Sequence, residues 1–429
     1  MPTAADPRAS SVPLRSPDGD ARPVRPLRIC MVALRHSLDD ARIVHREAQT
    51  LLALGHDVTL LFSCTEKYEY RRFDGRVLAT GRPPHGETDY AGCRVVGVRR
   101  TRASGRWRTF REMVRLAATL EADVYHAHEP DLALAVAVRA GRIQGRRGKR
   151  VLVVHDMHEY PPGEAVDHLP WLLKAPAHLG LMLWDKLLSR SVDHIFTANS
   201  VVRGYALVLS QRAPVDVLYN GASLRLFPQR TPTVWTGQGP LVLCHEGSLT
   251  FDRGLREMVA AVSHLRDRVR LRIIGDVFGA EREWLDAETE RLGLDGIITR
   301  SGWLPYREVG DALAECHVGA ILFRECLENV LAGPPNKLFH YMNAGLPVLS
   351  VGFPELRRIV LEEGCGVLVE DQSVDAIVRG IESLLRAPGT LPAMSEAGQR
   401  AIRDRYAWER METILGAAYG DIARRLNGV

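Results

Sequence analysis

Short apolar runs alternate with helical stretches along this chain from residue 27 onward. Most of the runs are continuously apolar, which is typical of parallel strands covered by helices on both faces. A helix is predicted at 39–55, where apolar positions recur every three or four residues and Gly55 ends the pattern. The strands are predicted in two series, the first at 27–34, 57–63, 93–98, 123–128, 150–156, 194–199 and 215–220, and the second at 241–247, 269–276, 296–302, 318–323, 347–351 and 366–370.

Alternation of strands and helices predicts right-handed βαβ units and doubly wound parallel sheets. Two such series, separated by a polar stretch rich in Pro and Gly, predict an α/β protein with two tandem Rossmann-like domains. The expected divisions are a disordered leader at 1–26, an N-terminal domain at 27–222, a linker at 223–240, a C-terminal domain at 241–405 and a closing helix at 406–429. Ligands bind at the carboxyl ends of the strands in such sheets, so we expect the site in the cleft between the domains.

The composition is that of an ordinary soluble globular protein, with 46% hydrophobic residues, 25% charged residues and a net charge of +4. This small charge gives no reason to expect a nucleic-acid partner. The seven cysteines form no disulfide or zinc spacing, which indicates a reducing compartment. No run of eighteen apolar residues predicts a membrane span. We expect a cytoplasmic protein, and peripheral contact with the inner membrane face stays open.

A single lysine stands out in the second half of the chain, which otherwise uses arginine. Lys337 lies in PPNKLFHYMNAGLPVLS and begins a short predicted helix that ends at Gly345. A helix that starts just past a parallel strand directs its free N–H groups into the cleft, and Lys337 adds a full positive charge. His340 follows at i+3 and shares that face. Phosphate is the expected ligand, and the alternative is a surface lysine lying over a packed helix.

A second cationic candidate directly follows the first strand of the second series, in EGSLTFDRGLREMV. Gly247 and Ser248 allow a tight turn, and Arg253 is suited to hold a diphosphate bidentately. Taken alone, a loop arginine is usually solvated. Together with Lys337 at the end of a neighbouring strand, Arg253 predicts a two-pronged diphosphate clamp.

The first domain carries histidines at the ends of two predicted strands, in HAHEPD and HDMHEYPP. We expect His128 and His158 to line the cleft as hydrogen-bond and proton-transfer partners of a hydroxylated substrate. His126 and His155 are equally well explained as packed strand ends. A metal site is disfavoured, because alternate residues of a strand point to opposite faces and the four histidines do not readily share one ion.

The first strand–helix loop, ALRHSLDDARIVHREA, lacks the GxGxxG fingerprint that a dinucleotide-binding dehydrogenase needs. Arg42 and Arg46 in this segment indicate an anionic ligand or solvent exposure. The chain therefore gives no sign of a nicotinamide or flavin cofactor.

Six segments, in this order, carry a resemblance to a known family: SLDDARIVHREAQTL, HAHEPDL, VVHDMHEYPP, YNGASLRLFP, CLENVLAGPPNKLFHYMNAGLPVLS and YAWERMETIL. Together they resemble the GT-B glycosyltransferases of the large retaining family four, over about residues 27–423. The resemblance implies that the second domain binds a nucleotide-activated sugar and the first domain binds a hydroxylated acceptor. It also implies that the closing helix crosses back to the first domain.

The resemblance also assigns roles to individual residues. The implied catalytic residues are His158 near the transferred sugar and Arg253 and Lys337 against the donor diphosphate. The implied donor-binding residues are Gly247, Ser248, Trp303, Leu304, Asn329, Asn336 and His340. The implied acceptor-side residues are Arg42, His128, Asp156 and Glu159. Neither a metal nor a cofactor is expected, since the clamp and the helix N-terminus supply the positive charge.

One position departs from the family pattern. The family normally has Glu where this chain has His340, and that Glu holds the ribose hydroxyls. A carboxylate accepts two O–H bonds, whereas a neutral imidazole accepts one. We therefore hypothesise an altered nucleotide preference, for example for a deoxyribose donor such as a dTDP-sugar; the alternative is that donor binding has been lost.

The sequence leaves the acceptor and two rival functions open. A polysaccharide, a glycolipid and a natural product are all compatible acceptors. The arginine-rich stretch 94–115 and the amphipathic stretch 171–188 suit either a membrane surface or ordinary solvation and packing, and Pro176 is expected to break the second. The rivals to a retaining transferase are a non-catalytic partner protein of the same fold and a sugar-nucleotide epimerase.

Overall fold

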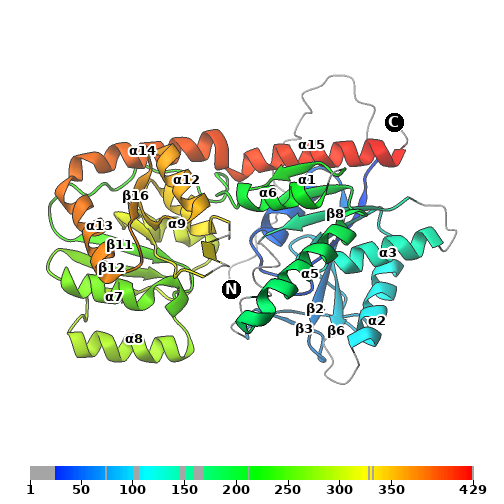
Figure 1. Cartoon of the computed structure of the whole chain (residues 1–429), viewed down its shortest axis with the longest axis horizontal. Coiled ribbons are helices and arrows are strands. Elements are labelled where there is room, and N and C mark those ends of the chain that lie inside the picture. Colours follow the sequence, from blue (N-terminus) through cyan, green and yellow to red (C-terminus); the bar gives the residue numbers. More distant parts are fainter. Residues whose placement is uncertain are drawn as a thin grey trace, which may run out of the picture.

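The computed structural model describes residues 25–72, 75–99, 106–144, 150–158, 166, 169–210, 212–326, 329–330 and 333–427. Two α/β halves lie side by side, each built around one large sheet, and the last helix begins where they meet and runs along the N-terminal half (Figure 1). This arrangement confirms the expected fold class, two tandem Rossmann-like domains with parallel sheets. Among the described helices, none has the length and apolar character needed to cross a membrane.

The N-terminal half contains an eight-stranded sheet with the order β10-β9-β8-β7-β1-β2-β6-β5. All neighbouring strands are parallel except β5 and β6. The strands are β1 Arg28–Val32, β2 Asp57–Cys64, β5 Thr88–Tyr90, β6 Cys93–Arg99, β7 Val124–His128, β8 Leu152–Met157, β9 His194–Thr197 and β10 Val215–Val217. The helices are α1 Gln49–Ala53, α2 Arg106–Thr119, α3 Leu132–Gln144, α5 Trp171–Ser189 and α6 Ser200–Leu209, and the π-helical segment η1 spans Ile43–Ala48.

The C-terminal half contains a six-stranded, fully parallel sheet with the order β13-β12-β11-β14-β15-β16. The strands are β11 Leu241–Glu246, β12 Val269–Ile274, β13 Ile298–Arg300, β14 Val318–Ile321, β15 Val348–Val351 and β16 Gly366–Val369. The helices are α7 Leu255–His264, α8 Gly279–Leu292, α9 Tyr306–Ala314, α11 Asn336–Ala344, α12 Pro354–Glu363, α13 Val374–Arg386, α14 Leu391–Ala401 and α15 Trp408–Asn427. The short segments η2 Phe251–Arg253, η3 Pro388–Thr390 and η4 Ile402–Tyr406 complete the described helical elements.

The continuously apolar strands are buried on both faces, as their pattern predicts. In β1, Ile29 and Met31 pack into one core cluster, whereas Cys30 and Val32 pack into another on the opposite face. The first cluster includes residues of α15, and the second includes residues of α3 and α6. Successive side chains of a strand point to opposite faces, so a strand between two helical layers must be apolar at every position.

Several local features differ from the sequence prediction, among them the short edge strand β5, which was in neither predicted series. The expected helix at 39–55 begins as the π-helical η1 and becomes α-helical only at Gln49. A small antiparallel hairpin, β3 Glu69–Arg71 and β4 Val77–Thr80, lies within the first half and was not predicted. Pro176 does not break the amphipathic stretch, since α5 continues through it. Pro176 lies near the start of α5, where it removes one bond to an exposed, water-accessible turn.

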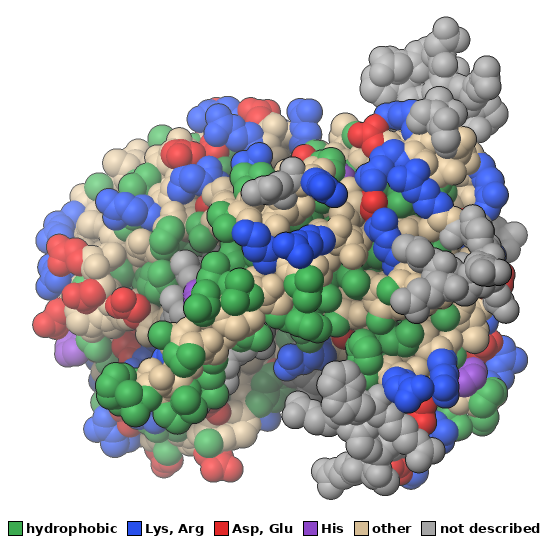
Figure 2. All heavy atoms as spheres, turned by 45° about the vertical axis from the view of Figure 1, so that its right-hand side comes forward, with side chains coloured by type: hydrophobic (Ala, Val, Ile, Leu, Met, Phe, Trp, Pro, Cys, Tyr) green, Lys and Arg blue, Asp and Glu red, His purple; other side chains and the backbone are tan. Residues whose placement is uncertain are grey.

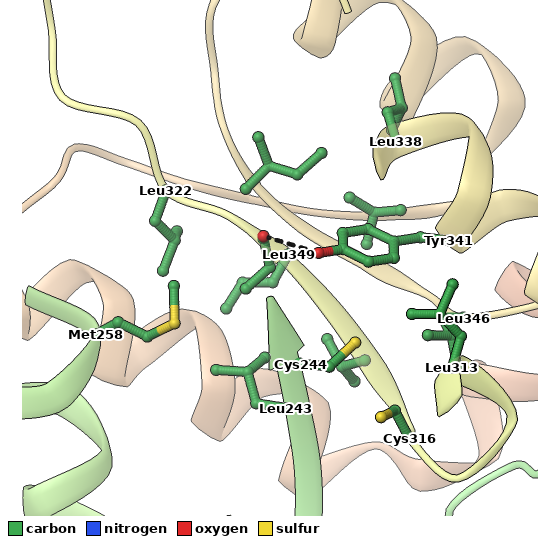
Figure 3. Close-up of a cluster of buried hydrophobic side chains, with 14 of the residues drawn as sticks. Leu243, Cys244, Met258, Leu313, Cys316, Leu322, Leu338, Tyr341, Leu346 and Leu349 are labelled. Atoms are coloured by element: carbon green, nitrogen blue, oxygen red, sulfur yellow. Dashed lines mark hydrogen bonds between the residues drawn. The ribbon is translucent and has the colours of Figure 1, made fainter. Parts of the chain in front are cut away.

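A tightly packed core holds α11 against the strands beneath it (Figure 3). Leu338 and Tyr341 of α11 lie over Leu243 and Cys244 of β11, and all four side chains are buried. The Tyr341 hydroxyl also donates to the Ala320 carbonyl at 3.5 Å. Because one face of α11 is fixed in this way, the residues at its N-terminus have a defined position at the carboxyl edge of the sheet.

The last helix, α15, begins beside the C-terminal half and packs along the N-terminal half (Figure 1). Trp408 at its start donates from Nε1 to Thr50 Oγ1 at 3.1 Å, and the Tyr419 hydroxyl lies 3.0 Å from His126 Nδ1. The buried apolar side chains of α15 join the core of the first half. The helix thus connects the two halves in the way that the family resemblance implies.

Candidate functional site

A cavity of about 1100 Å³ lies between the two halves. Its N-terminal wall comes from the segment after β1, including Asp40 and Arg46, and its C-terminal wall comes from the loops after β11 and β12 and from α11. In the C-terminal sheet β11 lies between β12 and β14, so the strand order reverses beside it. The crevice at such a reversal is where open α/β sheets bind ligands.

Two basic side chains lie close together here, although only Arg253 lines the cavity and Lys337 is buried beside it. Lys337, in the first turn of α11, is buried, and its Nζ lies 2.7 Å from His245 Nε2 at the end of β11. Arg253 comes from the loop after β11 and lines the cavity. Both contact the same ring, since Arg253 Cζ is 5.1 Å and Lys337 Nζ is 5.5 Å from the centre of Phe323. The structure therefore brings together the two residues expected to form the clamp.

Burial and the nearby charge of Arg253 both disfavour the protonated form of Lys337. Burial lowers the pKa of Lys337 well below its ordinary value, and the positive charge of Arg253 lowers that pKa further. Burial and these same two cations also lower the pKa of His245, so its ring is neutral and accepts a hydrogen bond from the Lys337 amine. A negative charge placed beside Lys337 and Arg253 would offset their mutual repulsion and raise the pKa of Lys337 again.

Glycine at position 254 fixes the turn that carries Arg253. Gly254 has a φ of +81°, and a Cβ atom built there would lie 2.1 Å from the Leu322 carbonyl oxygen at the end of β14. Only glycine tolerates both the left-handed backbone and this close approach. The Asp-Arg-Gly turn is thus held directly against the strand end that leads to Lys337.

His340 is part of a short hydrogen-bonded chain in the cavity wall. Its Nδ1 donates to Glu246 Oε2 at 2.8 Å, and its Nε2 accepts from the Tyr306 hydroxyl at 3.3 Å. His340 lowers the pKa of the buried Glu246 carboxyl, whose burial alone would raise it. Glu246 is therefore an ionised carboxylate in the same cavity. His340 also lines the cavity, and it fixes the position of the Glu246 carboxylate by a hydrogen bond.

The other expected donor-binding residues divide into two groups. Gly247, Trp303, Leu304 and Asn336 line the cavity together with His340. Ser248 and Asn329 do not belong to that lining: the Ser248 carbonyl lies 3.4 Å from His245 Nε2, and the Asn329 side chain donates to the Arg324 carbonyl of its own loop.

The two halves touch across the cavity. Arg46 Nη1 donates to Asn336 Oδ1 at 3.0 Å, and the Arg72 guanidinium lies 4.7 Å from the centre of the Trp303 ring. Arg46 is otherwise buried, and its Nη2 has no hydrogen-bond partner among the described residues. A cation from the N-terminal half therefore reaches the start of α11, next to the clamp.

The acceptor-side residues form one buried network rather than a cleft lining. Arg42 donates from Nε and Nη2 to the two oxygens of Asp156, at 2.8 and 2.7 Å, and its Nε lies 2.9 Å from Glu47 Oε1. His128 and Asp156 are fully buried, which corrects the expectation that His128 lines the cleft. The bidentate pair of Arg42 and Asp156 is buried, and it closes this part of the sheet edge to a ligand.

His158 is the partly exposed member of this network. Its Nε2 donates to Asp156 Oδ2 at 2.8 Å and lies 3.1 Å from His128 Nδ1. Burial lowers the pKa of His158, and that of His128 to about 4, so both rings are neutral near pH 7. Asp156 and His128 thus orient His158. Glu159 lies outside the described residues.

Four of these buried groups are close enough to suit a metal ion. One ligand atom each from Glu47, His126, His128 and Asp156 lies within 4.8 Å of the others. Arg42, however, already stands between the two carboxylates, and its charge occupies the position that a cation would take. Burial and the charge of Asp156 raise the pKa of Glu47 well above its ordinary value, so Glu47 holds a proton there.

Sequence reasoning missed His245 and Glu246 as site residues and left Arg46 undecided. Both missed residues end a strand that was recognised only as an apolar run. Their position immediately before Gly247, at the carboxyl end of the central strand β11, was the available signal.

Two family models match this chain, one to each half. The model described as Glycosyl transferases group 1 matches residues 240–387, and the one described as Glycosyl transferase 4-like domain matches residues 41–221. Together they account for most of the chain. Their junction coincides with the stretch between the two sheets.

Proteins of known name and structure are similar over nearly the whole chain. A glycogen synthase of Mycobacterium tuberculosis is 22% identical over 402 residues, covering 88% of this chain and 90% of that protein. Sucrose-phosphate synthase from Thermosynechococcus elongatus has a TM-score of 0.68 at 15% identity, covering 92% of this chain and 99% of that one. HepE of Anabaena, solved in complex with UDP, has a TM-score of 0.65 at 13% identity, covering 92% and 100%. The structural likenesses establish the fold that these chains share.

Proposed function

Because this chain belongs to the group 1 glycosyl transferases and is a hexosyltransferase-type enzyme, we propose that it transfers a sugar from a nucleotide-diphosphate donor to a hydroxyl acceptor with retention of configuration. The observation that carries this proposal is the pair of basic side chains, Arg253 and Lys337, both within 5.5 Å of the centre of the Phe323 ring. The complexes of HepE with UDP and with UDP-glucose support a nucleotide-sugar donor on this fold.

The clamp suits the charge that develops as the bond between sugar and phosphate breaks. Arg253, Lys337 and the free N–H groups at the start of α11 are preorganised around one place, which is the condition for strong transition-state stabilisation. These groups supply positive charge without a metal ion, so we propose a metal-independent reaction. In the proposed route the acceptor attacks the same face that the phosphate leaves, and the leaving phosphate oxygen takes the acceptor proton.

His158 is proposed to position the reacting sugar and acceptor. Its Nε2 donates to Asp156, and its side chain is 15% exposed, so part of the ring is accessible from outside the network. A neutral imidazole in this position donates or accepts one hydrogen bond with a sugar hydroxyl. Because the leaving phosphate takes the acceptor proton in this route, His158 need not act as a base.

Glu246 is proposed to replace the carboxylate that the family carries at position 340. It is ionised, it lines the cavity, and His340 engages only one of its oxygens. The other oxygen remains to accept O–H bonds from a ribose. This arrangement favours a ribonucleotide donor over the deoxyribose donor considered from the sequence, and it argues against lost donor binding.

Thermal-shift titration with UDP, ADP, GDP and dTDP tests the donor proposal, and product analysis follows with the corresponding sugar conjugates. We expect a ribonucleotide diphosphate to raise the melting temperature and to bind more tightly than dTDP. No shift with any diphosphate would favour a non-catalytic partner protein. Release of an isomerised sugar nucleotide from donor alone would indicate an epimerase.

A further inference from the structure

We propose that the exposed face of α5, together with the end of α6, docks on the surface of a membrane that contains anionic lipids. Trp171 is 79% exposed, Leu172 is 67% exposed and Leu183 is 59% exposed, which is unusual for side chains of this size. The exposed large apolar residues of the two helices are Trp171, Leu172, Leu173, Leu179, Leu183, Trp184, Leu187, Leu207 and Val208. Figure 2 shows hydrophobic side chains gathered on one face of the molecule, with lysine and arginine side chains beside them.

The spacing on α5 makes these side chains one surface. Leu172, Leu179, Leu183 and Leu187 follow one another at intervals of seven, four and four residues, so they share a face of the helix. Tryptophan lies toward both ends of the helix, at positions 171 and 184. Leucine along one face with flanking tryptophan is the pattern of a helix that lies in the interface of a bilayer.

The charges on these helices are almost all positive. Lys186, Arg190, Arg203 and Arg212 are exposed on α5, on α6 or directly after them. Among the described residues of α5 and α6, Asp185 is the single acidic side chain, and it accepts a hydrogen bond from the Tyr205 hydroxyl at 2.8 Å. An apolar face with cationic neighbours is complementary to anionic lipid headgroups, which attract each basic residue near the surface.

The same charges argue against a second copy of this chain as the occupant. In a two-fold dimer the same patch meets itself, so Lys186 and Arg190 of each copy would approach their equivalents. No exposed acidic residue of α5 or α6 is present in the described chain to offset that repulsion. A lipid surface covers the apolar face and neutralises the cations at once.

The position of α5 links this surface to the cleft. The parallel strands β8 and β9 are neighbours, so the chain leaves β8 at the carboxyl edge, where His158 lies, and enters β9 at the opposite edge. Helix α5 spans that distance, and its Trp171 end therefore lies on the cleft side. If the proposed function holds, on which this last step rests, the acceptor is a membrane-embedded molecule whose hydroxyl is presented to the cleft from the lipid surface.

Flotation of the full chain with vesicles tests the docking surface. The vesicles are phosphatidylcholine alone or phosphatidylcholine mixed with phosphatidylglycerol, at low and at physiological salt. We expect binding to the anionic vesicles and a decrease of at least tenfold in the partition coefficient for the double variant Leu179→Glu/Leu183→Glu. For Lys186→Ser/Arg190→Ser we expect a smaller decrease, which is larger at low salt than at physiological salt. Leu361→Glu on α12, where Leu361 is 53% exposed in the other half, is the matched control and is expected to bind normally.

Each alternative has its own result. Absence of binding to anionic vesicles, or an equal loss in the Leu361→Glu control, would overturn the docking surface. A dimer in size-exclusion chromatography that Leu179→Glu/Leu183→Glu dissociates, with no change in vesicle binding, would assign the face to a second copy. Thermal shift with UDP on the same variants keeps the two proposals apart, since we expect the docking variants to bind UDP normally. Incubation of labelled donor with a total lipid extract tests the acceptor, because label recovered only in the aqueous phase would exclude a membrane-embedded one.

Discussion

The carboxyl ends of the two sheets carry charged residues in opposite electrostatic situations. In the N-terminal half, Arg42 joins Asp156 and Glu47, and the network is closed and buried. In the C-terminal half, the charge of Arg253 lowers the pKa of Lys337, and the Lys337 amine hydrogen-bonds to His245, whose pKa is also lowered. One end is balanced by its own residues, whereas the other is arranged to gain from an added anion.

This difference indicates which half is suited to bind an anionic ligand. A closed ion-pair network fixes the position of His158 but offers no charge to a ligand. Two basic groups that packing holds close together lower the stability of the free protein. Perturbed pKa values of this kind are typical of ligand-binding and catalytic sites. This comparison supports the proposal that the donor binds to the C-terminal half, with the N-terminal half contributing shape and hydrogen bonds.

Removing the clamp lysine is the largest expected effect. We expect Lys337→Ala to lower turnover at least a hundredfold, because it removes a preorganised charge from the breaking bond. The melting temperature should not fall, because burial of the Lys337 amine away from water destabilises the folded protein and the variant removes that cost. Turnover with a nucleotide sugar and circular dichroism measure the two effects. Lys67→Ala, on an exposed lysine of the other half, is the control, and unchanged turnover in Lys337→Ala would mean that the clamp is misassigned.

The buried histidines of the N-terminal half predict acid sensitivity. Burial lowers the pKa of His155 to about 4, so the unfolded chain takes up a proton below pH 6.5 while the folded chain does not. Stability contributed by this neutral ring is complete above pH 6.5 and is lost as the pH falls toward 4, by about 2 kcal/mol between pH 6.5 and 5. Denaturant unfolding of His155→Gln should show a correspondingly smaller pH dependence. The exposed His264→Gln serves as control, and equal slopes in both variants would refute the assignment.

Substitution of Glu246 tests whether its carboxylate holds the ribose of the donor. We expect Glu246→Gln to weaken UDP binding about tenfold, because an amide is a weaker acceptor than a charged carboxylate. Binding of dTDP, which lacks one ribose hydroxyl, should change less. Isothermal titration with both nucleotides measures the difference. Tight UDP binding that the variant leaves intact would remove Glu246 from the site.

The depressed pKa of Lys337 makes diphosphate binding depend on pH in a defined direction. The free protein loses the Lys337 proton as the pH rises, whereas the bound diphosphate favours the protonated amine. UDP affinity should therefore fall with rising pH, by at most about tenfold per pH unit. Titration in buffers of different ionisation enthalpy should detect proton uptake on binding. Lys337→Ala should show neither effect, and proton release in the parent chain would contradict the argument.

A chelator is expected to have the smallest effect. Because Arg253 and Lys337 supply the charge at the diphosphate, and Arg42 already lies between the carboxylates of the other half, EDTA should leave turnover within about twofold. The rate measured before and after exhaustive chelation checks this. A large loss of turnover that added zinc or magnesium restores would indicate a metal site at Glu47, His126, His128 and Asp156.

Much of the fold was predictable because its determinants are local. Continuous apolar strands separated by helical periods predict two parallel sheets, and the structure contains every strand of both predicted series. The hairpin β3–β4 escaped prediction because its strands are short and mostly exposed or half-buried, so they carry no apolar run. The start of α11 at Asn336 was also close to the prediction, since Pro335 and Gly345 mark its two ends in the sequence itself.

The sequence by itself determined the architecture and singled out the two proposed clamp residues, since periodicity, a rare lysine and a glycine turn are properties of neighbouring positions. Tertiary structure alone decided how those residues are paired. Glu246 and His340 are 94 positions apart, and Arg42 and Asp156 are 114 apart, yet each pair is in hydrogen-bond contact. Burial and Coulomb interaction depend on the distance in space, so the lowered pKa values of Glu246 and Lys337 and the closed network around Asp156 exist only in the folded chain.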